Sequence, residues 1–453
     1  MRMGCLRSFK NNSGSVAVVA VILMTFLASM VLIFAARSTA RFKHVRNFEG
    51  ERQALYTAES GIEFACYEAR KPKDSVLTDT SLTILDGGSF KYNPFSDSLF
   101  GASEVVSEYV SGYLWVTSKG HYKTFSKTLR VKLGSRLPNA FRAGLVLTGE
   151  APVTVEGGTV QGPIRSKAGL IPPGAFLEYE KLRDSLPKLD EKVFKDAMDS
   201  IFRASQKIDS GQSKIGELVA YNSSNPPDFR KDSLLNHVGN VLINGDRIGQ
   251  VLVVEGPGIV ESAQGIQVSG NIQLRNVTLV AQGDITFFDN AKLINCTVLS
   301  FKRVHIGNKS DFDGTIYCQG TVEVLDEAKV QPYTLVYCLG RGKASNQQVV
   351  TLDGKATMAG TIISDCSSGI TYVGFEAAFS GILFTKASVD IRGTVNGTVI
   401  ARDFQSRAGE TEPFQAVFRD GKIDYYGMPP DYAAPIGLLI EPDFAIASWE
   451  VLE

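Results

Sequence analysis

A repeat in the second half of the chain constrains the fold more than any other feature of the sequence. Short apolar segments recur between residues 277 and 401, and threonines in the first four are spaced 19, 18 and 19 residues apart. The segments are 277–280, 296–299, 314–317, 333–336, 360–363, 380–383 and 397–400. A single short strand cannot bury its inner face alone, whereas stacked copies build one continuous core. The repeat therefore predicts a parallel β-solenoid.

Each early repeat also carries a second short strand at the same offset. These second strands are expected at 284–287, 303–306 and 321–324. Two strands in each coil fit a solenoid, and the general preference of parallel connections predicts right-handed winding. A β-sandwich is the alternative. The longer gap before Thr361 predicts one enlarged loop around 341–346.

Similar strand-like segments at 145–147 and 241–244 extend the predicted solenoid to 139–170 and 237–405. Between these parts, residues 171–236 contain two Pro-Pro pairs and a helical pattern. We expect a helical insertion there. The tail, 406–453, is expected to cap the last coil, because an uncovered solenoid end exposes unpaired strand edges.

An uncharged apolar run lies near the start of the chain, from Val16 to Ala36. It is 21 residues long, and Thr25 and Ser29 are its polar interruptions. At ~1.5 Å per residue this length crosses a bilayer core of ~30 Å. A secretory signal has a shorter core and a small-residue cleavage site. The run predicts a retained transmembrane helix at 15–36, with a cleaved signal or a buried core helix as the alternatives.

The apolar pattern continues beyond this run in an amphipathic form. Apolar residues recur every seven positions at Phe48, Leu55, Ile62 and Ala69. Such a stripe is typical of a helix that covers another element. We therefore predict one long helix over 16–70, half in lipid and half outside, with weak points at Gly50 and Gly61.

Residues 76–135 follow with the alternation of a small antiparallel sheet. The segments 113–117 and 128–133 both alternate between apolar and polar side chains, and a turn is expected around Gly120. The helix and this sheet together form a predicted unit at 37–135. Two hairpins without that relation to the helix are the alternative.

Two motifs in the N-terminal part carry a family resemblance. Asn12-Ser13-Gly14-Ser15 leads into the apolar run, and a second block follows from Arg52. The second block ends in Ala58, Glu59, Ser60, Gly61, Ile62 and Glu63. These motifs resemble the N-terminus of type IV pilins and pilin-like proteins, most closely PilX-type pilus assembly proteins. The resemblance covers about 60 of the 453 residues.

The resemblance implies that a prepilin peptidase cuts between Gly14 and Ser15 and removes 1–14 as a leader. It also implies a pilin-like arrangement of helix and sheet, and other pilin-like subunits and the membrane as partners. The sequence departs from major pilins at Val19, where they carry Glu. An unpaired carboxylate in lipid is costly. Its absence weighs against normal incorporation within a filament shaft.

Basic residues on the two sides of the apolar run give a conflicting signal about orientation. Arg2, Arg7 and Lys10 precede the run, and Arg37, Arg41, Lys43 and Arg46 follow it. Counted simply, the positive-inside rule places the large domain in the cytoplasm. The family resemblance instead implies a single-pass protein of the bacterial inner membrane with a periplasmic or extracellular large domain.

Charge and cysteine content exclude some classes of protein. The 47 basic and 48 acidic residues give a net charge of −1, without the basic excess of a nucleic-acid-binding protein. The six cysteines form no CxxC pair, and Cys5 lies in the expected leader. We predict that the four cysteines of the C-terminal half are mainly buried small side chains and do not form disulfide bridges. These are Cys296, Cys318, Cys338 and Cys366.

Candidate catalytic and metal-binding residues are few. Asp311 and Asp313 could form an acid pair, but Asp and Gly are also favoured in turns. Matching positions in three coils, Asp289, Asn308 and Asp326, are explained more simply as turn residues than as a calcium site. The four histidines lack zinc-site spacing, so His305 is expected to be a wall residue. Phe287-Phe288 is a weak candidate for a sugar-stacking platform.

The sequence therefore predicts a mainly β, membrane-anchored, pilin-like protein. We expect no enzymatic activity, cofactor or metal. The expected role is type IV pilus assembly or tip display at the cell surface, with the solenoid presented for adhesion to an extracellular glycan or protein ligand. The alternatives are a tethered carbohydrate-active solenoid enzyme and an inward-facing envelope scaffold resembling bactofilins.

Overall fold

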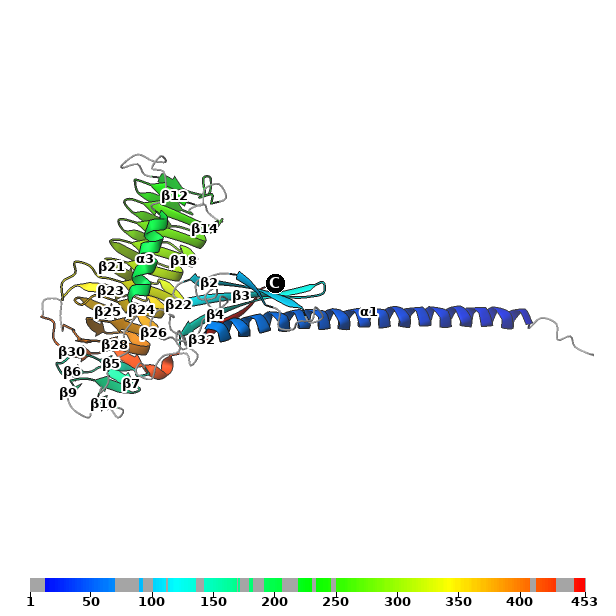
Figure 1. Cartoon of the computed structure of the whole chain (residues 1–453), viewed down its shortest axis with the longest axis horizontal. Helices are drawn as coiled ribbons and strands as arrows, with labels where there is room; N and C mark the ends of the chain where they lie inside the picture. The colour runs from blue at the N-terminus through cyan, green and yellow to red at the C-terminus, as the bar shows by residue number, and fades with distance from the viewer. Residues whose placement is uncertain are drawn as a thin grey trace, which may run out of the picture.

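The computed structural model confirms the predicted fold class. It describes residues 13–69, 89–92, 101–110, 113–135, 142–168, 170–171, 179–181, 191–205, 219–229, 234–245, 250–407, 413–428 and 444–452. The protein is mainly β, with one long N-terminal helix, a small antiparallel sheet and two large parallel sheets stacked as a solenoid. In Figure 1 the helix projects from the small sheet, and the solenoid stands across its far end.

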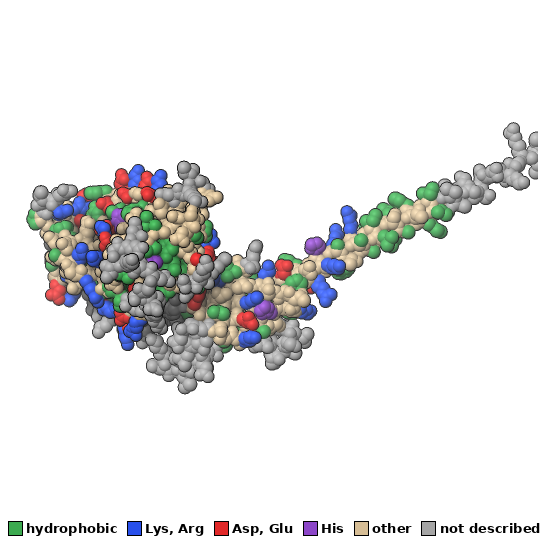
Figure 2. All heavy atoms as spheres, turned by 90° about the horizontal axis from the view of Figure 1, so that it is seen from above, with side chains coloured by type: hydrophobic (Ala, Val, Ile, Leu, Met, Phe, Trp, Pro, Cys, Tyr) green, Lys and Arg blue, Asp and Glu red, His purple; other side chains and the backbone are tan. Residues whose placement is uncertain are grey.

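The N-terminal helix α1 (Ser13–Ala69) is 57 residues long. Its described apolar half is long and hydrophobic enough to cross a membrane, and every residue from Ala20 to Glu49 is exposed. Figure 2 shows hydrophobic side chains along this outer half and a band of Lys and Arg between it and the sheet. The C-terminal half of α1 packs on the small sheet. This packed half and the small sheet are called the stub below.

The stub sheet has five antiparallel strands in the order β1-β2-β3-β4-β32. Their bounds are β1 (Ser89–Tyr92), β2 (Ala102–Val110), β3 (Tyr113–Tyr122), β4 (Phe125–Ser135) and β32 (Phe444–Leu452). The predicted pairing of 113–117 with 128–133 is confirmed. The turn was predicted around Gly120 and lies instead between Tyr122 and Phe125, where Lys123 has a positive φ of 53°.

The solenoid contains a fourteen-stranded parallel sheet. Its main path, in spatial order, is β10 (Tyr179–Lys181), β8 (Ile164–Ser166), β5 (Leu145–Leu147), β28 (Thr394–Ala401), β26 (Ala378–Thr385), β24 (Thr357–Ser364), β22 (Lys329–Cys338), β20 (Asp311–Cys318), β18 (Lys292–Ser300), β16 (Ile272–Ala281), β14 (Leu252–Ser262) and β12 (Leu234–His237). Beside β28 lies β31 (Lys422–Asp424), which also pairs with β7 (Thr159–Gln161). The seven repeated segments all fall within β16 to β28.

The second solenoid sheet has ten parallel strands, one from each coil. They are β11 (Val219–Tyr221), β13 (Val241–Asn244), β15 (Ile266–Ser269), β17 (Ile285–Phe287), β19 (Arg303–Ile306), β21 (Thr321–Val324), β23 (Gln348–Leu352), β25 (Ile370–Val373), β27 (Ser388–Ile391) and β29 (Asp403–Phe404). A small third sheet joins β30 (Val417–Arg419), β6 (Val153–Glu156) and β9 (Leu170–Ile171). The predicted second strands of the early repeats are therefore confirmed, and the enlarged loop lies between β22 and β23.

The solenoid core is a continuous column of apolar side chains from both large sheets. Rings such as Phe287, Phe312 and Phe379 are fully buried in it. Because the same strand position faces inward in every coil, each buried side chain stacks on an equivalent one above and below. Fully burying one such side chain stabilises the fold by about 1.5–3 kcal/mol.

The chain does not run through the solenoid in one direction. β5 pairs with β28, so residues 145–147 join the end of the stack that the last coil forms. The first coils, with β11 and β12, lie at the opposite end (Figure 1). The predicted helical insertion at 171–236 is therefore only partly helical. It contains the solenoid strands β10, β11 and β12 as well as helix α3 (Glu191–Ser205).

Helix α3 lies along the outside of the fourteen-stranded sheet. Phe194 stacks on Tyr337 of β22 with ring centroids 5.0 Å apart, and Phe202 meets Phe301 after β18 at the same distance. The apolar face of α3 covers a stripe of outward-facing apolar side chains from several coils. Lys195 adds an ion pair of 3.2 Å to Asp365. The helix therefore ties neighbouring coils together from outside.

The tail differs from the expected cap. Strands β30 and β31 and the 3₁₀ helix η2 (Tyr425–Gly427) do lie at the end of the solenoid. The last strand, β32, instead pairs with β4 and completes the stub sheet. The expectation of a cap over all of 406–453 is therefore wrong for this strand. Every solenoid strand lies between β4 and β32 in the sequence, so the solenoid is an insertion into the stub.

Candidate functional site

The family-like block of the sequence forms the contact between α1 and the stub sheet. Ala58 and Ile62 are fully buried, and Gly61 is buried between them. Leu114 and Val116 of β3 lie in the same cluster. Glu59 and Ser60 are half-buried and Glu63 is exposed. The small and apolar residues of the block thus face the sheet.

Close approach of helix and strand explains the two glycines at this contact. A Cβ atom on Gly120 of β3 would collide with the Ala54 carbonyl oxygen and the Ala58 amide nitrogen. A Cβ on Gly61 would collide with the hydroxyls of Ser103 and Ser118. Gly120 therefore lets β3 reach the backbone of α1, while Gly61 makes room for two serine side chains of the sheet. The sequence marked Gly61 as a weak point, and the structure shows its packing role.

The predicted apolar stripe is wrong at its N-terminal end. Phe48 is 65% exposed and Val45 is 55% exposed, beyond the edge of the sheet. Gly14 and Ser15, the predicted cleavage pair, lie in the first turns of α1. The side chain of Ala69 lies outside the described residues, as does Cys5. Arg37, Arg41, Lys43 and Arg46 are all exposed on α1.

A cleft of about 400 Å³ separates the stub from the solenoid. Lys132 of β4 points from the outer face of the stub sheet into this joint, and 6% of its surface is exposed. Its Nζ atom lies 4.9 Å from the ring centre of Tyr333 and 5.2 Å from that of Trp115. Asp313 of β20 and Glu450 of β32 also line the cleft. An ammonium between aromatic rings is a favourable cation–π arrangement.

Burial dominates the electrostatics of the joint. It lowers the pKa of Lys132 to about 8, and Asp313 opposes that shift. Burial likewise raises the pKa of Asp313, while Lys132 opposes that shift. The charged forms of Lys132 and Asp313 are therefore less stable in the joint than in water, although each group lies near the opposite charge.

Tyr333 departs from the repeat to make this contact. Seven consecutive coils place a positive-φ residue at the same kink of the fourteen-stranded sheet: Asn276, Asn295, Gly314, Tyr333, Gly360, Gly381 and Gly397. Tyr333, with φ of 67°, is the bulky member of this column. The register slips by two residues here, because Phe312 pairs with Val330 before the kink and Thr315 pairs with Leu335, not Thr334, after it. A bulky residue in this conformation is strained, which fits a site that fixes the joint.

A polar groove of about 810 Å³ crosses the first coils where the fourteen-stranded sheet turns into the ten-stranded one. Its polar lining comes from Asn240, Gln264, Gln267, Gln282, Asp284, Thr286 and Lys302. The amide of Asn240 donates to Oε1 of Gln264 across one rung, at 2.7 Å. The register places Gln267, Thr286, His305 and Glu323 in one outward row of the ten-stranded sheet.

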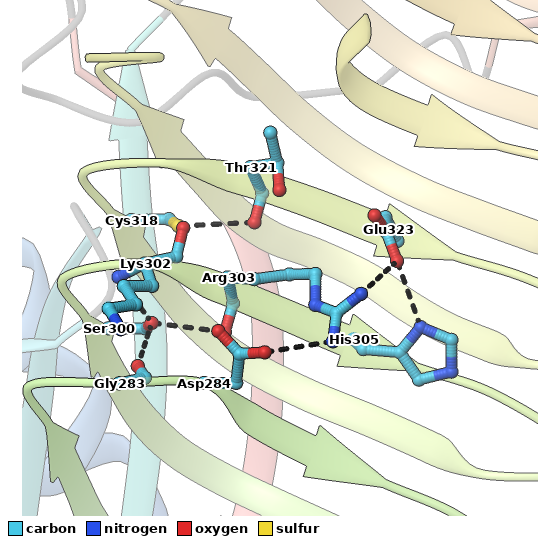
Figure 3. Close-up of polar contacts among 9 residues, drawn as sticks. All are labelled: Gly283, Asp284, Ser300, Lys302, Arg303, His305, Cys318, Thr321 and Glu323. Atoms are coloured by element: carbon cyan, nitrogen blue, oxygen red, sulfur yellow. Dashed lines mark hydrogen bonds and ion pairs between the residues drawn. The ribbon is translucent and has the colours of Figure 1, made fainter. Parts of the chain in front are cut away.

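A network of ion pairs, drawn in Figure 3, lies beside the groove and begins at its lining residue Asp284. Arg303 donates to Asp284 at 2.8 Å and lies 3.7 Å from Glu323. Nδ1 of His305 lies 3.1 Å from Oε2 of Glu323. The hydrogen bond with His305 lowers the pKa of Glu323, and Arg303 adds to the effect. His305 is therefore part of a polar face and more than a wall residue.

The corner behind the groove uses serine and cysteine interchangeably (Figure 3). Ser300, Cys318 and Cys338 occupy the same register column. The Ser300 hydroxyl donates to the Gly283 carbonyl at 2.8 Å, and the Cys318 thiol donates to that of Thr321 at 3.2 Å. All four late cysteines are buried and unbridged, as predicted. Burial raises the pKa of the Cys296 thiol to about 12, so this thiol is unreactive.

The other candidate residues take structural positions. Asp311 and Asp313 lie on one side of β20 at the kink before Gly314, where a turn between coils was expected. Asp313 faces the joint, while Asp311 lies beside Lys292 at 4.0 Å. Asp289, Asn308 and Asp326 have positive φ angles and form a hydrogen-bonded turn column. Phe287 is buried in the core, and the half-buried Phe288 lies 5.6 Å from the His305 ring.

In the described part of the chain, no group of three or more His, Cys, Asp or Glu side chains could hold a metal ion. His237 is buried against Tyr221, with Nε2 2.9 Å from the hydroxyl. His44 lies on α1 and His121 on β3.

The fold and site define a class of protein: a β-solenoid inserted into a small helix-and-sheet unit whose helix could span a membrane. No family model matches the chain, and no curated protein matches it. Among solved structures, the chain is similar to the competence-associated pilin ComZ from Thermus thermophilus. The identity is 12%, the match covers 89% of this chain and 97% of that chain, and the TM-score is 0.21. A likeness at that level carries no argument here.

Proposed function

We propose that this chain is a membrane-anchored, pilin-like protein of type IV pilus assembly, which mounts its solenoid outside the bacterial inner membrane. One observation carries the proposal. A single continuous helix packs its C-terminal half on an antiparallel sheet, while its apolar N-terminal half is exposed along its whole described length. Exposed apolar surface of that length needs lipid or the helices of other subunits to cover it.

The contact residues of the stub support the same proposal. Ala58, Gly61 and Ile62 belong to the block that resembles PilX-type proteins, and they make the helix–sheet contact. The return of β32 to the stub sheet closes this unit around the inserted solenoid. The stub is then a complete unit that carries the solenoid and presents it for adhesion or for contact with a partner.

We propose a binding role and no catalytic role for the solenoid. The one candidate acid pair, Asp311 and Asp313, is divided between a strand surface and the joint with the stub. The partners proposed are a prepilin peptidase, other pilin-like subunits and an extracellular ligand.

A second candidate is an inward-facing envelope scaffold. The exposed basic residues Arg37, Arg41, Lys43 and Arg46 favour it, because they outnumber the basic residues before the apolar run. In that orientation the solenoid would lie in the cytoplasm and no leader would be cut.

N-terminal sequencing distinguishes the two candidates. The protein is purified from envelope fractions of cells with and without prepilin peptidase. The pilin-like proposal predicts a start at Ser15 that depends on the peptidase. An intact Met1 in both strains would contradict it and favour the scaffold.

A further inference from the structure

The polar groove has the form of a ligand site. Its volume of about 810 Å³ falls in the range of natural ligand sites. Its lining is unusual for such a site, because amide and hydroxyl groups from three successive coils dominate it. Amide side chains donate and accept hydrogen bonds, as do sugar hydroxyls. The groove crosses stacked rungs ~4.8 Å apart, so its polar groups repeat along the solenoid axis.

Two glycines, on the coils before and after Lys302, keep the groove open around this lysine. Lys302 lies in the corner column between Gly283 and Gly320, which carry no side chains. A Cβ on either glycine would collide with the backbone of the neighbouring rung. Gln264 is the next side chain in this column, beyond Gly283. Gln264 and Lys302 thus face a shared hollow.

The charges in and around the groove are almost balanced. Asp284 and Glu323 both pair with Arg303, and Glu323 also binds His305. Lys302 is exposed, and among the described residues its ammonium has no ion pair or hydrogen-bond partner. One cation without a pairing partner among the described residues therefore lies among neutral hydrogen-bonding groups.

This chemistry narrows the class of ligand. The centre of a protein–protein interface is depleted in charge and rich in aromatic anchors, and the groove lining contains no aromatic side chain. A nucleic acid would require a basic stripe, and here most cations are paired with carboxylates. A sugar polymer offers many hydroxyls and, in some cases, a carboxylate on its rings. The hydroxyls fit the amide side chains of the groove, and a carboxylate fits its single lysine.

We propose that this groove binds a linear polysaccharide that carries carboxylate groups, such as a uronic acid polymer. Lys302 pairs with a sugar carboxylate, while Gln264 and Gln267 on one rung and Gln282 on the next bind hydroxyls. The biological setting, a glycan met outside the cell, rests on the proposed display function. The binding itself does not depend on that function.

The test is affinity electrophoresis of the detergent-solubilised full chain in native gels. Separate gels contain polygalacturonate, alginate or hyaluronate, and a dextran gel serves as the neutral comparison. We expect retardation by at least one carboxylated polymer and none by dextran. Added salt should weaken the retardation, because an exposed charge pair is screened.

Two matched variants locate the binding. Lys302→Gln should weaken binding about tenfold, as expected for loss of one hydrogen bond to a charged group. Lys355→Gln removes the same charge from an exposed turn outside the groove and should leave binding unchanged. Both residues are exposed, and melting curves check that both variants fold.

The proposal is overturned if none of the three acidic polymers retards the protein, or if dextran retards it equally. It is also overturned if Lys355→Gln weakens binding as much as Lys302→Gln does. None of these outcomes bears on processing at Ser15, so the groove and the pilin-like proposal can fail separately.

Discussion

The stub and the solenoid bury apolar surface in different ways. In the stub, each contact between α1 and the sheet is unique. Gly120 lets β3 reach the α1 backbone, and Gly61 makes room for the Ser103 and Ser118 side chains. In the solenoid, every contact has copies in the neighbouring coils. A local change in the stub therefore removes a contact that nothing else supplies, while a change in one coil is buffered by its neighbours.

The two regions are nevertheless interdependent through the chain path. Strand β5 precedes all other solenoid strands in sequence but closes the end formed by β28. Strand β32 follows the whole solenoid and completes the stub. Each region therefore depends on segments that are distant in sequence, and that costs loop-closure entropy on folding.

The largest effect is expected where the stub backbones meet. Gly120→Val should destabilise the stub by about 4 kcal/mol or more, because the new side chain collides with the α1 backbone. Limited proteolysis should then cut α1 from the sheet while the solenoid stays intact.

The matched control for this variant is Gly342→Ala in the enlarged solenoid loop. Gly342 has open space around it, so its cost should be only about 1 kcal/mol, from its positive φ. Equal protease resistance of the Gly120→Val variant and wild type would contradict the packing described for the stub.

The next effect concerns the helix that ties the coils together. Phe194→Ala should cost about 3 kcal/mol, because Phe194 is 1% exposed and stacks on Tyr337. Lys192→Ala, on the exposed side of α3, should change stability little. Thermal unfolding followed by circular dichroism measures both. Similar melting temperatures for the two variants would show that packing of α3 does not stabilise the solenoid coils.

A smaller, pH-dependent effect is expected at the joint. The pKa of Lys132 falls from 10.5 to about 8 on folding, so the unfolded chain binds more protons between these values. The free energy of unfolding should therefore rise by a few kcal/mol as pH increases from about 8 to 10.5. Lys132→Met should lack this rise, while keeping most of the apolar contact. The measurement is the difference in unfolding free energy between the two proteins across that pH range.

The smallest effect should occur in the serine and cysteine column. Cys318→Ser should change stability by less than about 1 kcal/mol, because Ser300 already fills the same position one coil away. Cys296 is equally buried, but it pairs with Gly314 rather than with a serine, and its thiol has only 3.5 Å contacts to the Leu274 and Ile294 carbonyls. Cys296→Ser should therefore cost more. Equal melting temperatures for the two variants would argue against a special role of the column.

The solenoid could be predicted because its signal repeats. Thr278, Thr297 and Thr315 fall in one register column, as their spacing indicates. Thr334 keeps the spacing but leaves the column, because β22 carries two more residues than β20 at the kink that contains Tyr333. The ring of Tyr333 faces Lys132 of the stub. A repeat read from sequence does not show which coil contacts another domain.

The path of the chain could not be predicted. Strand β32 alternates like any edge strand, and its partner β4 lies about 300 residues earlier. Nothing local in 444–452 distinguishes a cap from a fifth strand. The groove was missed for a similar reason. Gln264, Asp284 and Lys302 are separated in sequence, and coil stacking brings them together.

In the proposed function, α1 anchors the solenoid on the outer side of the inner membrane. Labelling of Lys355→Cys with a membrane-impermeant maleimide tests this directly, because Lys355 is exposed and the solenoid's own cysteines are buried. Wild-type protein controls for any background from native cysteines. We predict labelling of the variant in intact spheroplasts, equal to that after lysis. Labelling that requires lysis would place the solenoid in the cytoplasm and contradict the account.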